Sequence, residues 1–238
     1  MDPLRSVRLR LADARLYLIF TPSVCTDADP LAVLAAVLPH VDMVQVRVKR
    51  PDRALEPGRG ATEALERTDP RELYDWCVRV LELRRAARAE HVLVLANDRV
   101  DVARSLAERG LDGVHVGRED TPPRIARAQL GPDALIGWST HSLAEVASSA
   151  DEPVDYLGFG PIRATATKGY VRGLGFEAAW IASQAVCLPV FPIGGIGLAE
   201  AEDLVEVGRA AVSSAILCAP DPAHAASAIR AALSGDAP

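Results

Sequence analysis

The stretch Val41-Asp-Met-Val-Gln-Val-Arg-Val-Lys49 decides the fold, because two kinds of side chain alternate along it. A period of two predicts a β-strand whose successive side chains point to opposite faces. One set is the valines at positions 44, 46 and 48, and the other is Met43, Gln45, Arg47 and Lys49. In a barrel strand the valines would face outer helices. The second set would point inward and climb toward the carboxyl-terminal mouth.

Strand-like apolar runs recur on both sides of this stretch, and each is followed by a segment with helical periodicity. The expected strands are residues 15–20, 41–49, 91–96, 113–117, 134–138, 154–159, 189–193 and 211–217. The expected helices are residues 31–38, 71–90, 100–109, 122–130, 142–150, 176–186, 198–207 and 222–233. Eight such units predict an α/β fold, a single (β/α)8 TIM barrel over residues 1–238.

Two places interrupt this pattern. Residues 50–70 carry Pro, Gly and charge without periodicity, which indicates a long βα loop on the catalytic side of the barrel rather than a domain linker. Pro192 lies inside the seventh expected strand, where its missing N–H predicts a gap in the ladder or an early strand end.

Composition excludes several classes of function. A net charge of −6 argues against a nucleic-acid partner held by a basic face. No run of about 18 apolar residues exists, so no membrane span is expected. The first ten residues lack the apolar region of a signal peptide, which predicts a cytoplasmic protein. The four cysteines are far apart, without the spacing of a zinc site.

Arg47 and Lys49 would place two cations inside a barrel of low dielectric, which is costly unless an anion meets them. Their functional interpretation is a clamp for a diphosphate, with Arg47 suited to bidentate contact. The alternative is a structural ion pair between Arg47 and Asp98.

Carboxylates follow two neighbouring strands. Asp98 comes after Asn97 at the end of the third strand, and Asp120 follows the fourth. Oxygen ligands near a cationic clamp suggest Mg²⁺ that bridges carboxylates to phosphate oxygens. Asp98 alone could instead be the N-cap of the next helix, and both roles can coexist.

Three later loops carry phosphate-binding features. The stretch Tyr156–Gly169 begins as an apolar strand and ends in glycines, with the donors Thr165, Thr167 and Lys168. Gly194-Gly195 follows the seventh strand, and Ser213-Ser214 lies in the eighth. Loops after strands seven and eight form the usual phosphate site of such barrels.

Ser139-Thr-His141 does not indicate a hydrolase, because adjacent strand residues point to opposite sides and no G-x-S-x-G elbow surrounds them. A hydrogen bond from Ser139 to a ligand is the expected role. His115 lies between valines within a strand and is expected to be a structural histidine.

These motifs together resemble the thiamine phosphate synthase family, from the first strand to the last. The motifs are Val44-Gln-Val-Arg-Val-Lys49, Ala96-Asn-Asp-Arg-Val-Asp101, Asp112-Gly-Val-His-Val-Gly-Arg-Glu-Asp120, Trp138-Ser-Thr-His141, Gly158-Phe-Gly-Pro-Ile-Arg-Ala-Thr-Ala-Thr-Lys168 and Ile193-Gly-Gly-Ile196.

The resemblance implies transfer of a hydroxymethylpyrimidine group from its diphosphate to hydroxyethylthiazole phosphate, by a Mg²⁺-assisted dissociative path that releases pyrophosphate. The substrates would be small molecules, with no covalent nucleophile. The implied catalytic residues are Ser139, Lys168 and Arg47. The implied diphosphate contacts are Gln45, Arg47, Lys49, Asn97 and Lys168, and the metal ligands are Asp98 and Asp120. The thiazole phosphate would be held by Thr165, Thr167, Gly195, Ser213 and Ser214.

The sequence departs from the family at Arg118, where glutamine is usual, and in a shortened region before Ser213. Two alternatives therefore stay open. One is a thiazole tautomerase-like paralogue, but such relatives typically lack the second metal carboxylate, so the presence of Asp120 argues against it. The other is a non-catalytic thiazole-phosphate-binding protein. A homodimer is possible on either reading.

Overall fold

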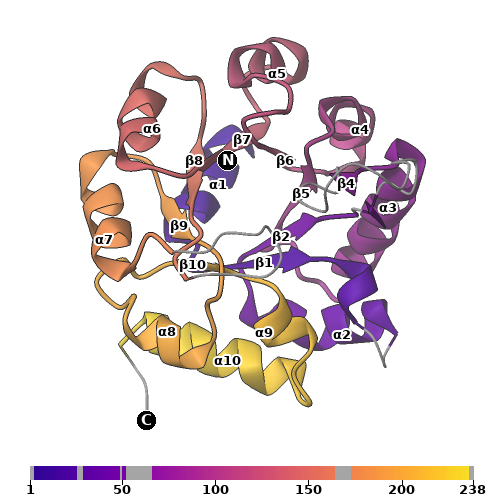
Figure 1. Cartoon of the computed structure of the whole chain (residues 1–238). Coiled ribbons are helices and arrows are strands. Elements are labelled where there is room, and N and C mark those ends of the chain that lie inside the picture. Colours follow the sequence, from indigo (N-terminus) through magenta and orange to yellow (C-terminus); the bar gives the residue numbers. More distant parts are fainter. Residues whose placement is uncertain (1–2, 26–28, 49, 52–65, 164–172, 236–238) are drawn as a thin grey trace, which may run out of the picture.

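In a computed structural model, eight parallel strands form a ring with helices around it (Figure 1). The structure describes residues 3–25, 29–48, 50–51, 66–163 and 173–235. Neighbouring strands follow the order β10-β1-β2-β5-β6-β7-β8-β9. The predicted TIM barrel is therefore confirmed.

The elements have the following bounds. The barrel strands are β1 Leu16–Phe20, β2 Met43–Val46, β5 Leu93–Asn97, β6 Gly113–Val116, β7 Leu135–Thr140, β8 Tyr156–Phe159, β9 Val190–Pro192 and β10 Ala210–Val212. The helices are α1 Pro3–Asp13, α2 Pro30–Val37, α3 Pro70–Ala86, α4 Val100–Leu106, α5 Pro123–Leu130, α6 Leu143–Ser148, α7 Phe176–Ala185, α8 Leu198–Glu202, α9 Ser214–Leu217 and α10 Pro222–Leu233. A separate antiparallel pair is β3 Arg50–Pro51 with β4 Glu66–Arg67.

The alternation predicted for the second strand separates two apolar clusters. Val44 and Val46 pack in the cluster that includes the outer helices. Met43 belongs to an interior cluster built almost wholly from strand residues, together with Tyr17 and Phe191. Gln45 is buried and bonds to Tyr17 in this interior, so the inward direction predicted for Met43 and Gln45 is confirmed.

The barrel closes weakly at one seam. β9 ends at Pro192, as expected for a residue without an N–H, and it pairs fully only with β8. Between β9 and β10 the structure has a single bridge, Ile193 to Ala211. The seam therefore lies beside the loops that follow these two strands.

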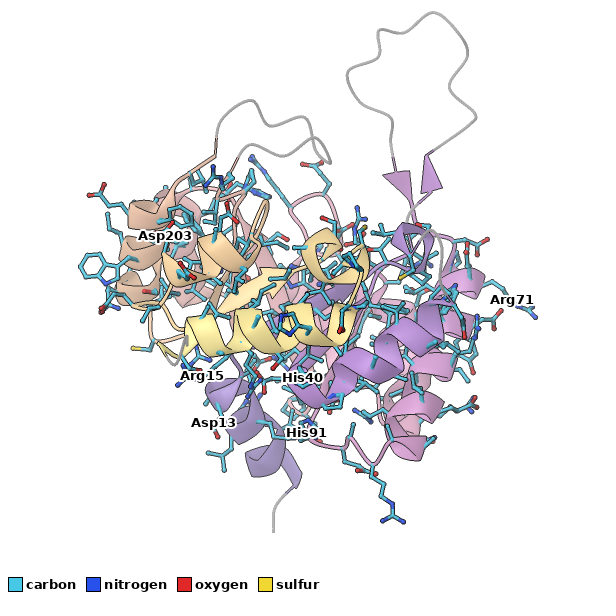
Figure 2. The ribbon with its side chains drawn as sticks, turned by 90° about the horizontal axis from the view of Figure 1, so that it is seen from below. Asp13, Arg15, His40, Arg71, His91 and Asp203 are labelled. Atoms are coloured by element: carbon cyan, nitrogen blue, oxygen red, sulfur yellow. The ribbon has the colours of Figure 1, made fainter. Side chains whose placement is uncertain are left out.

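Helix α1 covers the amino-terminal end of the barrel, a feature that the sequence analysis missed. Leu11 and Ala14 are buried against the interior cluster. Arg8 pairs with Asp155 at 3.2 Å, and Arg10 pairs with Asp112 at 3.3 Å. Figure 2 shows α1 at one end of the molecule and the β3–β4 pair at the other. The helix therefore leaves the carboxyl-terminal mouth free.

Three aspartates at this same end stand directly before β2, β6 and β8. Each accepts a hydrogen bond from a backbone N–H of the preceding barrel strand, and each pairs with an arginine from an outer helix. The backbone partners are Leu16 at 3.0 Å from Asp42, Val94 at 2.8 Å from Asp112 and Ile136 at 2.8 Å from Asp155. The arginines are Arg230 at 2.6 Å, Arg84 at 2.7 Å and Arg127 at 2.6 Å, respectively. These pairs tie adjacent strands together.

The expected eighth strand is wrong in its second half. β10 ends at Val212, and residues 214–217 form helix α9. A short apolar run such as Ala211–Leu217 fits a buried strand and a buried helical turn equally well, so periodicity alone did not separate them. The long 50–70 loop begins and ends in the β3–β4 pair, and residues 52–65 lie outside the described residues.

Candidate active site

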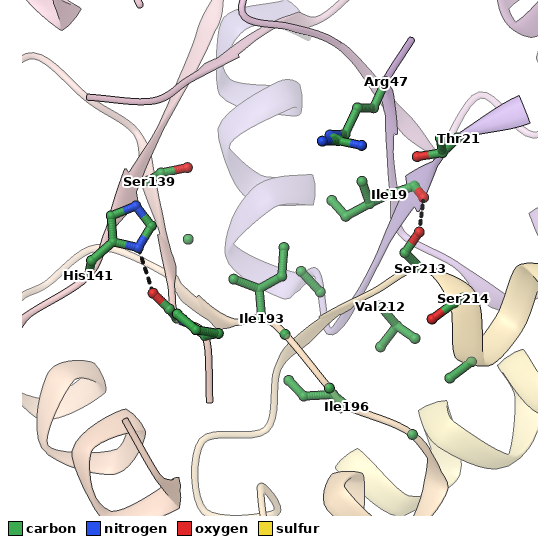
Figure 3. A pocket seen from close by; sticks show the side chains of 18 of the residues that line it. Ile19, Thr21, Arg47, Ser139, His141, Ile193, Ile196, Val212, Ser213 and Ser214 are labelled. Carbon is green, nitrogen blue, oxygen red and sulfur yellow. Dashed lines mark hydrogen bonds between the residues drawn. The ribbon is translucent and has the colours of Figure 1, made fainter. Parts of the chain in front are cut away.

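A pocket of about 550 Å³ opens at the carboxyl-terminal ends of the strands. Its wall includes Arg47 and Ser139 and the loops that follow β9 and β10. In Figure 3 the Arg47 guanidinium extends toward the middle of the pocket, with Ser139 and His141 on one side and Ser213 and Ser214 on the other. The pocket thus brings together residues that lie more than 160 positions apart in the sequence.

Arg47 stands one residue beyond β2. Its backbone N–H donates to the Phe20 carbonyl at 2.9 Å, which extends the pairing with β1 and fixes where the side chain leaves the wall. The side chain is half-buried and lines the pocket, as predicted. Lys49, the second expected cation, lies outside the described residues.

Asn97 and Asp98 end β5 with two unusual features. Asn97 is 5% exposed, and its Nδ2 has no hydrogen-bond partner among the described residues. A buried donor in that condition costs about 1–3 kcal/mol. Asp98 has a φ of 63°, a left-handed conformation that is uncommon for residues other than glycine. The N-cap of α4 is Arg99, so the alternative role of Asp98 as a helix cap is not realised.

Asp120 is held at the end of the neighbouring strand. Its Oδ2 accepts a hydrogen bond from the Gly117 N–H at 2.7 Å. A Cβ at position 117 would lie 2.9 Å from that oxygen, so any other residue there would require the carboxylate to shift. Within the described ranges no three His, Cys, Asp or Glu side chains gather as a metal site. Mg²⁺ is commonly bound by one or two carboxylates with substrate phosphates, and two carboxylates on neighbouring strand ends fit that pattern.

Ser139 lies near the end of β7, and its Oγ is 2.9 Å from Nε2 of His115. The other ring nitrogen of His115, Nδ1, is 3.1 Å from the Tyr156 hydroxyl. His115 is therefore fully hydrogen-bonded, as expected for a structural histidine. The sequence did not indicate that one of its partners would be a pocket residue.

Another part of the pocket wall comes from the loops that follow β9 and β10. Gly194 and Gly195 have φ values of 98° and 68°, and such consecutive left-handed residues can turn successive N–H groups toward an anion. Ser213 donates its hydroxyl to the Ile19 carbonyl at 2.9 Å, and Ser214 begins α9. Thr165, Thr167 and Lys168 lie outside the described residues.

Arg118 is not among the residues that line the pocket. Its guanidinium lies 3.7 Å from Glu145 on α6, and the Arg118 side chain is 75% exposed. The departure from the family's usual glutamine is therefore a change at the rim.

The residues that sequence reasoning missed are Tyr17 and Tyr156, whose hydroxyls lie 2.8 Å apart inside the barrel. Tyr17 and Ile19 are two residues apart in β1, so both side chains point into the barrel. This alternation is the sequence pattern from which the inward direction of Tyr17 could have been predicted.

Fold and site together define a (β/α)8 barrel whose carboxyl-terminal mouth carries the Arg47 cation, the Asp98 and Asp120 carboxylates and the Gly194–Gly195 turn. This is the arrangement of barrel enzymes that act on phosphate-bearing ligands. A family model described as thiamine monophosphate synthase matches residues 16–216. The chain belongs to the thiamine monophosphate synthase family.

Individual relatives agree with this assignment. A thiamine-phosphate synthase from Azorhizobium caulinodans is 43% identical over 146 residues, which are 60% of this chain and 68% of that protein. One from a Synechococcus species is 40% identical over 220 residues, which are 92% of this chain and 55% of that protein. The chain thus spans little more than half the length of the Synechococcus protein. Neither alternative function is favoured by these names.

Solved structures show the same barrel. Thiamine phosphate pyrophosphorylase from Pyrococcus furiosus matches with a TM-score of 0.74 at 27% identity, over 97% of this chain and 98% of that one. A 3-hexulose-6-phosphate synthase from Salmonella typhimurium has a TM-score of 0.61 at 16% identity, over 93% and 99% of the chains, which shows a shared fold alone.

No described helix is both long and apolar enough to cross a bilayer.

Proposed function

We propose that the chain is a thiamine-phosphate synthase, a transferase that joins a hydroxymethylpyrimidine diphosphate to hydroxyethylthiazole phosphate and releases pyrophosphate. The observation that carries the proposal is the pocket itself, with the Arg47 cation on one side and the Gly194–Gly195 backbone on the other. This reaction needs two anion sites in one cavity, one for the leaving diphosphate and one for the acceptor phosphate.

The diphosphate side consists of Arg47 and Asn97, with Lys49 and Lys168 as further predicted contacts. Negative charge grows on the diphosphate as its bond to the pyrimidine methylene breaks, and a guanidinium takes up that charge best when it is fixed beforehand. The unpartnered Nδ2 of Asn97 is a donor that a phosphate oxygen would satisfy. Gln45 was also predicted to contact the diphosphate, and its amide nitrogen faces Tyr17 at 2.6 Å. The second Nε2 hydrogen is the donor left for such a contact, because the amide oxygen can only accept.

The acceptor side is assigned to Gly195, Ser213 and Ser214, with Thr165 and Thr167 as predicted contacts. Because the Ser213 hydroxyl is directed at Ile19, the contribution expected from Ser213 and Ser214 is mainly backbone N–H. Arg163 pairs with Glu200 at 3.1 Å, and the Glu200 carboxylate also accepts from the Gly197 N–H at 3.0 Å. The loop after β8 is thereby tied to the loop after β9.

Asp98 and Asp120 are the residues that would hold Mg²⁺. When bound, the ion would neutralise charge on the diphosphate oxygens. The left-handed backbone at Asp98 is consistent with a functional role, since strained residues concentrate at such sites. The expected partners are the two small-molecule substrates, and a homodimer stays a prediction.

The test is an assay with hydroxymethylpyrimidine diphosphate, hydroxyethylthiazole phosphate and Mg²⁺, in which thiamine phosphate is followed with and without a chelator. Product that disappears with chelator and in Asp98→Ala would establish both the synthase and its metal. A folded protein that binds thiazole phosphate without making product would refute the proposal and favour the tautomerase-like or binding alternative.

A further inference from the structure

A line of hydrogen bonds crosses the barrel interior and ends at Ser139. Five side chains from five different strands take part. The links are Gln45 Nε2 to Tyr17 Oη at 2.6 Å, Tyr17 Oη to Tyr156 Oη at 2.8 Å, Tyr156 Oη to His115 Nδ1 at 3.1 Å and His115 Nε2 to Ser139 Oγ at 2.9 Å. We call these residues the interior chain.

The surroundings of the interior chain are shaped to hold it. Gln45, Tyr17, Tyr156 and His115 are each at most 8% exposed, so water does not compete for these bonds. A Cβ at Gly137 would lie 2.1 Å from Cζ of Tyr156 and 2.5 Å from Nδ1 of His115. The contact between Tyr156 and His115 therefore occupies the space that any other residue at position 137 would fill.

Only one direction gives both tyrosine hydroxyl hydrogens an acceptor within the interior chain, because the reverse direction leaves the Tyr17 hydrogen without one. An amide nitrogen only donates, so Tyr17 accepts from Gln45 and gives its own proton to Tyr156. Tyr156 then gives its proton to Nδ1 of His115. Burial raises the pKa of Tyr17 and of Tyr156 well above the ordinary value for tyrosine, so both hydroxyls have a proton to give.

We propose that the interior chain fixes His115 with its proton on Nε2, and thereby presents Ser139 as a hydroxyl donor to the ligand in the pocket. Nε2 donates to Ser139, whose oxygen accepts, and the Ser139 hydrogen is left to point at a ligand oxygen. Tyr17, Tyr156 and His115 are positioning residues in this arrangement.

This direction also decides between two roles of the Ser139–His115 pair. A serine nucleophile needs a histidine nitrogen that can accept its proton. Here that nitrogen carries a proton itself, because its partner nitrogen is occupied by the Tyr156 donor. The pair therefore serves charge stabilisation at the leaving group, and no covalent intermediate forms on Ser139.

The first test reads the tautomer directly and does not depend on turnover. Nitrogen NMR of the imidazoles in the folded protein, with His115 assigned by its absence in His115→Gln, reports which ring nitrogen carries the proton. We expect a protonated Nε2 and an unprotonated Nδ1 at neutral pH. In Tyr156→Phe we expect a mixture of both tautomers. A proton on Nδ1 in the wild type, or an unchanged tautomer in Tyr156→Phe, would overturn the proposal.

The second test is a double-mutant cycle, and it rests on the proposed synthase function. Ser139→Ala should lower kcat by about a hundredfold, and Tyr156→Phe by about tenfold, the value of one hydrogen bond, with KM little changed. In the Ser139→Ala background, Tyr156→Phe should cause no further loss. Multiplicative losses would mean a merely structural role and would contradict the inference.

Tyr74→Phe is the matched control, because Tyr74 packs on the outer cluster and is no part of the interior chain. It should retain the wild-type kcat and the His115 tautomer. If wild-type protein shows the expected tautomer but no synthase activity, the proposed function fails while the hydrogen-bond direction stands.

Discussion

The two ends of the barrel differ in how their polar side chains are paired. At the amino-terminal end each of Asp42, Asp112 and Asp155 has both an arginine and a backbone donor. At the carboxyl-terminal end Asn97 has an orphaned donor and Asp98 a left-handed backbone. At the amino-terminal end these three carboxylates are paired within the chain, although the Nε atoms of Arg10 and Arg84 lack a hydrogen-bond partner among the described residues. At the carboxyl-terminal end it is an amide donor at the mouth, Asn97 Nδ2, that lacks one. We therefore expect stability and function to be separated along the barrel axis, as in other barrels of this class.

The change with the largest expected effect tests the amino-terminal end. Asp112→Ala leaves Arg84 without its carboxylate, and both side chains of this pair are only 9% exposed. Removing one partner of a buried ion pair costs about 3–5 kcal/mol. Urea denaturation should show this loss of unfolding free energy, while kcat per folded molecule stays unchanged. Asp75→Ala, in the exposed pair with Arg71, is the control and should leave the curve in place.

Arg47→Ala tests the other end and should have the reverse effect. Loss of one fixed charge at a developing anion lowers kcat/KM by about 10²–10³-fold, whereas the urea midpoint should fall much less than in Asp112→Ala. Arg47→Lys should recover part of the activity, because lysine keeps the positive charge but loses the bidentate contact of the guanidinium. A large drop in stability for Arg47→Ala would show that the two ends are not separated.

Asn97→Leu sharpens the comparison, because it should change both properties in opposite directions. Removal of an unsatisfied buried amide is expected to raise the unfolding free energy by about 1 kcal/mol. The same change removes a ligand donor and should lower kcat/KM by about tenfold. Denaturation and steady-state kinetics on one preparation measure both. If stability falls instead, the Asn97 side chain is a structural element.

The smallest effect is expected for Arg118→Gln, the residue usual in the family. The ion pair with Glu145 is largely exposed, and such pairs contribute little. We expect kcat/KM within about twofold of wild type and an unchanged urea midpoint. A larger change would mean that the rim at α6 takes part in binding.

Features set by local pattern were predictable from the sequence. The valine alternation around Arg47 fixed which side chains face inward, and the missing N–H of Pro192 fixed the end of β9. Helix α1 was missed because the partners of Arg8 and Arg10 are aspartates more than 100 positions away. The residues next to Arg8 and Arg10 in the sequence give no sign of these partners, so both side chains would be expected to face solvent.

The site was predictable in its residues more than in its connections. Arg47 and Ser139 line the pocket as expected, while the link from Ser139 through His115 to Tyr156 depends on three strands meeting in register. Gly137 leaves the space in which Tyr156 and His115 meet. A single glycine within a strand does not indicate from the sequence which side chains fill that space. The start of helix α9 at Ser214 was also not predictable from local sequence, because tertiary packing determines whether this apolar run is a strand or a helix.

The seam between β9 and β10 has a consequence for how the molecule moves. Seven of the eight joints between barrel strands are continuous ladders, and this one is a single bridge at Ile193. Backbone amides beside it should exchange with deuterium sooner than those of β5 and β6, because fewer bonds must open. The wall can thus part next to Gly194 and Ser213 without breaking a ladder. A barrel normally considered rigid would therefore open preferentially along this seam, which borders the proposed acceptor-phosphate site.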